Sequence, residues 1–310
     1  MKIAHALALA AVAATPALAQ EAAEPVTPAS VVASAPASDW RAIDPADLLV
    51  MILAPDREGR PRQVVVQLMP TPFSQGWVGN IRTLARAHWW DGTSVYRVVD
   101  NWVAQWGDVD ETKPLPEGIL TVHEAEYVHM RDMPRNKALD RLFWPPSDFQ
   151  RWTAFHDGFP YAGVGGPDSV SNWPAHCYGS VGVARDIEST GTGTELYAVI
   201  GHAPRQLDRN IAVVGRVIEG IEHLATLPRG KGEAGVYDDA ALRVPIVSAR
   251  LGSEVEYLPQ PHFEYLASES ESFARYVQVR ANRNDPFYKV AAGGIDVCNV
   301  QVPIRRVMAE

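Results

Sequence analysis

A single arginine interrupts an apolar stretch of the chain, the segment GTSVYRVVDNWVAQWGD at residues 92–108. Arg97 carries a guanidinium that stays protonated and presents several N–H groups in a fixed fork, so it can direct a charged hydrogen bond at one acceptor. Trp102 and Gln105 follow in the same segment. Taken singly, each has a structural explanation: a surface arginine, a core tryptophan and a satisfied interior amide. The rest of the chain must decide between these roles and a site.

Two strands are expected to position this segment, at residues 94–99 and 102–106, because both runs are rich in β-branched and aromatic residues. Apolar side chains recur with the helical period between Trp77 and His88, which predicts a helix. A second, short helix is expected at residues 219–227. Further strands are predicted at residues 63–69, 180–184, 196–201, 211–217 and 244–251. Many strands with two helices indicate a closed or nearly closed β-sheet.

The first 19 residues have the pattern of a secretory signal peptide. Lys2 precedes an apolar run, and Ala17 and Ala19 supply the small residues of a cleavage site. Residues 20–39 are rich in Ala, Pro and Ser without periodicity, which is typical of a flexible tether, so the folded part is expected to begin near Trp40. We expect an exported bacterial protein of the periplasm that acts as a monomer.

Composition and spacing argue against several functions. The formal net charge of −9 is opposite to the positive charge that nucleic-acid binding favours. No stretch of about 18 apolar residues follows the signal peptide, so no membrane span is expected. His123-Glu124 and His129 do not form a zinc motif, because histidines at this spacing face different sides of a helix. Cys177 and Cys298, the only cysteines, are expected to pair in an oxidising compartment rather than to serve a Cys/His hydrolase.

Five segments, in order, resemble the cyclophilin-type peptidyl-prolyl isomerases. They are NIRTLA at 80–85, YRVVDNWVAQWGD at 96–108, GSVGVA at 179–184, TELY at 194–197, and LD at 207–208 with VVGRVIEG at 213–220. The resemblance implies a mostly β fold, a closed eight-stranded antiparallel β-barrel capped by two helices. It places a cyclophilin-like domain at residues 40–251, with an insertion at 109–178 and a C-terminal extension at 252–310 packed on the core.

The resemblance also implies a reaction. Rotation about an X-Pro peptide bond has a barrier of roughly 20 kcal/mol but makes and breaks no covalent bond, so neither a metal nor a cofactor is implied. Arg97 would donate to the prolyl nitrogen as the amide twists, with Gln105 hydrogen-bonding beside it. The substrate-binding positions carried over from the family are Trp102, Val103, Glu195, Tyr197 and Leu207. The expected partners are Pro-containing unfolded or extended segments of exported proteins.

Some positions depart from the family's pattern. Glu195 stands where a glutamine is common, and an acid there could form an ion pair with Arg97. Gln206 replaces the tryptophan of cyclosporin-sensitive members, and Arg185 replaces an asparagine that binds the substrate backbone. These departures favour an alternative, a catalytically weak binding module or chaperone for Pro-containing segments. A structural protein of the envelope is a third class, suggested by the tether alone.

The insertion at residues 109–178 is dense in aromatic residues and proline. It could form a wall or lid over the substrate groove, or a separate cluster under a long loop. In the extension, Phe273, Tyr276 and Val277 have the spacing of an amphipathic helix. A disulfide between the two cysteines would join the end of the insertion to the extension.

Overall fold

The computed structural model describes residues 25–307 except residues 145–146, 148, 167–168 and 256–261. The signal peptide expected at residues 1–19 and the start of the expected tether lie outside the described residues. Within the described part of the chain, no helix is both long enough and apolar enough to span a membrane.

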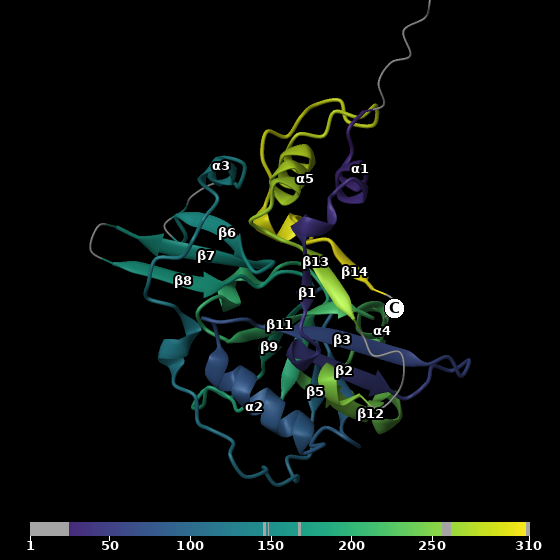
Figure 1. Cartoon of the computed structure of the whole chain (residues 1–310). Helices are drawn as coiled ribbons and strands as arrows, with labels where there is room; N and C mark the ends of the chain where they lie inside the picture. The colour runs from purple at the N-terminus through teal and green to yellow at the C-terminus, as the bar shows by residue number, and fades with distance from the viewer. Residues whose placement is uncertain (1–24, 145–146, 148, 167–168, 256–261, 308–310) are drawn as a thin grey trace, which may run out of the picture.

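Eight antiparallel strands close into a barrel in the order β10-β5-β4-β12-β2-β3-β11-β9, which confirms the expected fold (Figure 1). The strands are β2 (Leu48–Leu53), β3 (Arg62–Leu68), β4 (Ser94–Val98), β5 (Val103–Gly107), β9 (Ser180–Val183), β10 (Leu196–Val199), β11 (Val213–Glu219) and β12 (Val244–Leu251). Alternate residues such as Leu49, Met51 and Val64 belong to the barrel core. Side chains therefore fill the interior of the barrel, and a site must lie on its outside.

Two helices cap the barrel, as expected. The helix α2 (Gln75–Arg86) buries Trp77, Ile81 and Leu84 in the barrel core. The helix α4 (Glu222–Ala225) is a single turn that buries Leu224 in the same core. Because these side chains recur on one face, the helical period in the sequence reports the packing surface.

The C-terminal extension packs against the barrel as a small sheet with one helix. The sheet has the order β1 (Trp40–Ile43), β13 (Phe263–Leu266) and β14 (Ile304–Arg306). The helix α5 (Glu271–Ala281) begins after Ser270, whose side chain accepts from the backbone N–H of Phe273. It buries Phe273, Tyr276 and Val277, which confirms the predicted amphipathic helix.

The segment before Trp40 is not a tether throughout. Residues 28–33 form the helix α1 (Pro28–Ala33), which lies beside α5 (Figure 1). Val31 is buried in a cluster with Phe273 and Val277. The prediction of a flexible tether at residues 20–39 is therefore wrong for its second half. The apolar partner that orders α1 lies more than 200 residues further along the chain, so local composition could not show it.

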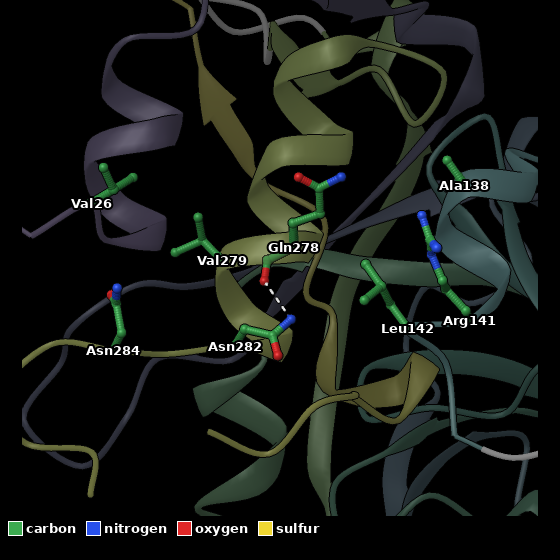
Figure 2. A pocket seen from close by; sticks show the side chains of 8 residues that line it. All are labelled: Val26, Ala138, Arg141, Leu142, Gln278, Val279, Asn282 and Asn284. Atoms are coloured by element: carbon green, nitrogen blue, oxygen red, sulfur yellow. Dashed lines mark hydrogen bonds between the residues drawn. The ribbon is translucent and has the colours of Figure 1, made fainter. Parts of the chain in front are cut away.

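A pocket of about 430 Å³ lies where α1, α5 and the helix α3 (Lys137–Asp140) approach one another (Figure 2). Its lining consists of Val26, Ala138, Arg141, Leu142, Gln278, Val279, Asn282 and Asn284. The side-chain amide of Asn282 donates to the carbonyl of Gln278, one turn earlier in α5 (Figure 2). Arg141 is the charged residue of this lining. Because the lining contains no acidic residue or histidine, it offers no pair of side chains for acid–base chemistry.

The insertion forms a second small sheet, β6 (Trp152–His156), β7 (Phe159–Gly165) and β8 (Val170–Pro174). Tyr161 and Trp173 are fully buried, so the aromatic residues of the insertion form packing surface. Cys177 and Cys298 are joined in a disulfide with their Cα atoms 5.0 Å apart, as expected from the sequence. Short 3₁₀ turns lie at Ala37–Asp39, Pro45–Asp47, Glu124–Tyr127, Arg205–Leu207, Glu233–Gly235, Ala240–Leu242, Gly252–Glu254 and Val297–Asn299.

Candidate active site

One groove on the outside of the barrel collects all the site residues predicted from the sequence. It has a volume of about 1130 Å³. The predicted residues that line it are Arg97, Trp102, Val103, Gln105, Glu195, Tyr197 and Leu207. They come from positions spread over more than 100 residues of chain, so the barrel is what brings them together.

Strand register explains how three of them meet. Arg97 on β4 pairs with Gln105 on β5, and Gln105 pairs with Tyr197 on β10. Residues directly opposite one another on paired strands point to the same face of a sheet. The three side chains therefore form a row across three neighbouring strands in the groove.

Arg97 is held by two acceptors and an aromatic ring. Its Nη1 donates to Oε1 of Gln105 at 2.8 Å, and its Nε donates to the carbonyl of Ala234 at 2.7 Å. The guanidinium carbon lies 5.4 Å from the centre of the Trp102 ring. Among the described residues, no acceptor binds Nη2 and no carboxylate forms an ion pair with Arg97. Partial burial lowers the pKa of Arg97, but an arginine remains protonated at neutral pH. Nη2 is thus a charged donor that remains available in the groove.

Glu195 does not pair with Arg97, which corrects the expectation of a direct ion pair. Its Oε2 accepts from the hydroxyl of Tyr96 at 2.7 Å, and its Oε1 accepts from the backbone N–H of Asp108 at 2.7 Å. The side-chain amide of Gln105 donates to the Tyr96 hydroxyl oxygen at 2.5 Å. A chain of hydrogen bonds therefore runs from Glu195 through Tyr96 and Gln105 to Arg97, and it turns the amide oxygen of Gln105 toward the guanidinium.

Tyr96 is a site residue that the sequence reasoning missed. Neighbouring residues of a regular strand point to opposite faces, so Tyr96 is not expected beside Arg97. The pairing of β4 with β5 shifts in register between Val95 and Arg97, and both Tyr96 and Arg97 line the groove. A β-bulge of this kind re-aims a side chain, and nothing in the local sequence marks it.

The carboxyl group of Glu195 sits in a nearly closed space. A Cβ atom on Gly107, where φ is +153°, would lie 1.9 Å from Oε1 of Glu195, so only glycine leaves room for the carboxyl group. Burial raises the pKa of Glu195 above its usual value, although the Tyr96 hydroxyl and the Asp108 N–H oppose this shift. Burial, together with the charge of Glu195, also raises the pKa of Tyr96. Tyr96 therefore stays a hydroxyl donor at neutral pH.

An apolar hollow adjoins Arg97. Trp102, Val103, Tyr197 and Leu207 line the groove here, and they cluster with the buried Val199 behind them. An apolar slot of this kind can hold a ring such as that of proline, while Arg97 at its edge faces the polar amide. The hollow and the donor lie in the same groove.

Comparison with known proteins supplies the family. The family model described as "Cyclophilin type peptidyl-prolyl cis-trans isomerase/CLD" matches residues 63–251, more than half of the chain. The chain belongs to the cyclophilin family. None of the curated protein sequences matches this chain.

One solved cyclophilin structure shares the fold over most of the chain. The cyclophilin AquaCyp293 from Hirschia baltica superposes with a TM-score of 0.65 at 23% identity, covering 92% of this chain and 99% of that one. A Cryptosporidium parvum cyclophilin-type peptidyl-prolyl cis-trans isomerase, crystallised in the presence of the dipeptide Ala-Pro, matches with a TM-score of 0.36 at 13% identity, covering 66% of this chain and 98% of that one. The first comparison extends the similarity beyond the barrel to most of the insertion and extension of this cyclophilin.

Part of the insertion of this cyclophilin forms a wall of the groove, and another part forms packed clusters away from it. Its first part lines the groove through Glu111, Lys113, Leu115 and residues 121–124. Its aromatic part packs elsewhere: Tyr161 lies in the barrel core, and Phe143 clusters with α5. The insertion is therefore a wall of the groove at its start and packing material in its later part.

Arg185 lines the groove, but its guanidinium donates to backbone carbonyl groups of neighbouring residues. Its Nε and Nη2 donate to the carbonyl of Asn210, and its Nη1 donates to the carbonyl of Asp186 at 2.7 Å. A cyclophilin with asparagine at this position has an amide that can pair with a substrate backbone. Here the guanidinium instead ties two loops of the groove together.

Proposed function

We propose that this cyclophilin catalyses the cis–trans isomerisation of X-Pro bonds in unfolded or extended polypeptides. The observation that carries the proposal is the Nη2 group of Arg97, a charged donor with no partner among the described residues, beside the apolar hollow of Trp102 and Tyr197. Donor and hollow supply the two functions that amide rotation needs. The signal-peptide pattern at residues 1–19 supports other exported proteins as substrates, which recovery of the protein in a periplasmic fraction would test.

The proposed mechanism uses no covalent intermediate. In a planar amide the nitrogen lone pair is delocalised into the carbonyl, and this delocalisation creates the barrier of roughly 20 kcal/mol. Twisting the bond returns the lone pair to the prolyl nitrogen, which then becomes an acceptor. Arg97 would donate to this nitrogen in the transition state more strongly than in the ground state, and such a difference lowers the barrier. The hollow would hold the proline ring while the preceding residue rotates.

The direct test is exchange of a short peptide that contains one X-Pro bond. The purified protein is expected to accelerate the exchange, followed by a protease-coupled assay or by NMR exchange spectroscopy. A preparation made identically from cells that lack the gene controls for a contaminating isomerase. Exchange at the uncatalysed rate, with Pro-containing peptides still bound, would overturn the enzyme proposal and support the alternative of a binding module. The donors of Arg185, which are already used within the protein, are the observation that keeps this alternative open.

Changing Glu195 to glutamine is expected to lower kcat/KM about fivefold. The Tyr96 hydroxyl and the Asp108 N–H donate to different oxygens of Glu195, and glutamine replaces one of these oxygens with an NH2 group that cannot accept. The loss of about 1 kcal/mol of hydrogen bonding would loosen the orientation of Gln105 and, through it, of Arg97. The same exchange assay measures this effect.

Glu117→Gln is the matched control, because Glu117 is exposed and does not line the groove. It is expected to keep wild-type activity. A rise in the activity of Glu195→Gln would show that the carboxylate restrains the site. Unchanged activity would show that the hydrogen-bond chain does not affect Arg97.

A further inference from the structure

A fully buried group of polar side chains lies behind the apolar hollow. Nδ1 of His176 is 2.9 Å from Oδ1 of Asp208, and Nε2 of His176 is 3.0 Å from the hydroxyl of Tyr197. His176 and Asp208 are both 0% exposed, and neither lines the groove. Tyr197 does line the groove, so this group reaches the proposed substrate only through the Tyr197 ring.

The charge of Asp208 determines which nitrogen of His176 carries the proton. Burial alone would raise the pKa of Asp208, but the hydrogen bonds from His176 and the nearby charge of Arg205 lower it below its usual value. Nε of Arg205 donates to Oδ2 of Asp208 at 2.7 Å, and the indole N–H of Trp173 donates to the same oxygen at 3.2 Å. The carboxylate therefore accepts the proton of Nδ1, and in a neutral imidazole this leaves Nε2 as an acceptor for the Tyr197 O–H.

The neighbouring strand leaves space for the Tyr197 hydroxyl. Gly182 on β9 lies opposite Tyr197 on β10. A Cβ atom at Gly182 would lie 2.3 Å from the hydroxyl oxygen of Tyr197 and 2.4 Å from the ring carbon that bears it. A side chain at residue 182 would thus displace the ring from its present position. Gly182 leaves the space beside the hydroxyl, and His176 supplies the acceptor for it. Both features fit a tyrosine at residue 197.

We propose that His176 and Asp208 are positioning residues for isomerisation, which hold the Tyr197 ring in place as a wall of the proline hollow. This inference rests on the proposed function. His176 anchors the hydroxyl, Asp208 holds the imidazole, and Gly182 leaves the ring room to lie against β9. A phenylalanine at residue 197 would pack in the same place without this anchor. The anchored ring sets the width of the hollow, so the hydrogen bond acts on how tightly a proline ring is held.

A double-mutant cycle on Tyr197 and His176 tests the proposal. Tyr197→Phe removes one oxygen atom. His176→Asn keeps an N–H that can donate to Asp208 and removes the acceptor for Tyr197. Each single variant is expected to raise KM for an X-Pro peptide about 3- to 10-fold, with a smaller change in kcat, because one buried hydrogen bond is lost. In the Tyr197→Phe background, His176→Asn should have no further effect on KM.

The peptide dissociation constant, measured by NMR titration, reports how tightly the hollow binds a proline ring, and it does not require turnover. If the wild type binds peptide but does not catalyse exchange, the proposed function fails, while the same cycle on Kd still tests the anchor. Additive effects of the two changes, or single variants with unchanged KM and Kd, would overturn the proposal and leave the group a purely structural role. If His176→Asn does not fold, Tyr197→Phe decides alone: unchanged KM and Kd would overturn the anchor, and the expected rise would support it.

Discussion

The Arg97→Ala variant is expected to catalyse X-Pro exchange about 10- to 100-fold less efficiently than the wild type, measured as kcat/KM. The variant loses a charge-assisted hydrogen bond to the prolyl nitrogen, and such a bond contributes about 1.5–3 kcal/mol. Arg97→Lys is expected to recover little of this loss. A lysine restores the charge, but it has no planar fork to bind Gln105 and the Ala234 carbonyl while a third donor faces the groove.

Arg97 can be changed without a large loss of stability, because its side chain is only partly buried and forms no ion pair with a described residue. Both variants should therefore keep the cooperative unfolding of the wild type. Arg57→Ala is the matched control, since Arg57 is exposed on the loop between β2 and β3. If Arg97→Ala keeps full activity while folded, the donor role assigned to Arg97 is wrong.

Replacing both Cys177 and Cys298 with alanine is expected to lower the free energy of unfolding by about 2–5 kcal/mol. The two cysteines are separated by 121 positions, so the disulfide closes a long loop and removes much conformational freedom from the unfolded chain. Cys177 lies at the end of the insertion, just before β9, whereas Cys298 lies in the extension. Denaturation in urea, monitored by circular dichroism, measures the change.

The wild-type protein and the double variant should respond differently to a reductant. Reduction is expected to shift the midpoint of wild-type unfolding toward that of the variant and to leave the variant unchanged. An identical midpoint for the oxidised wild type and the double variant would show that the disulfide does not stabilise the fold. Free thiols in protein isolated without reductant would show that the pair does not form.

Much of the barrel follows from local patterns. Seven of its eight strands lie where the residue types predict them, and the helix α2 lies where the helical period predicts it. The pattern misses β2, whose sequence LLVMIL does not alternate. Leu49 faces the barrel core, while Leu48 and Val50 pack against Phe263 of the extension. Both faces of β2 are buried, so the strand reads as one apolar run, which periodicity alone cannot tell from a short buried helix.

Some residues of the site could be predicted from the sequence, and others could not. Arg97, Gln105 and Tyr197 can be named from the order and spacing of the family-like segments, because those segments specify which strands lie side by side. Tyr96 could not be named, since it reaches the groove through a register shift in β4. His176 could be noticed as a histidine next to a cysteine, but its partners Asp208 and Tyr197 lie 32 and 21 residues away.

From its residues, this chain can be recognised as a closed or nearly closed β-sheet, and its resemblance to the cyclophilins adds the barrel and an arginine beside an aromatic slot. Periodicity and composition record which side chains are buried, because burial depends on each residue's own polarity. They do not record which buried group meets which, since that depends on register and on packing between distant segments. The fold therefore decides that Glu195 binds Tyr96 instead of Arg97, that α1 packs on α5, and that His176 anchors Tyr197. A shift of one residue along a strand would break the Glu195–Tyr96 and His176–Tyr197 hydrogen bonds while leaving the same apolar pattern in the sequence.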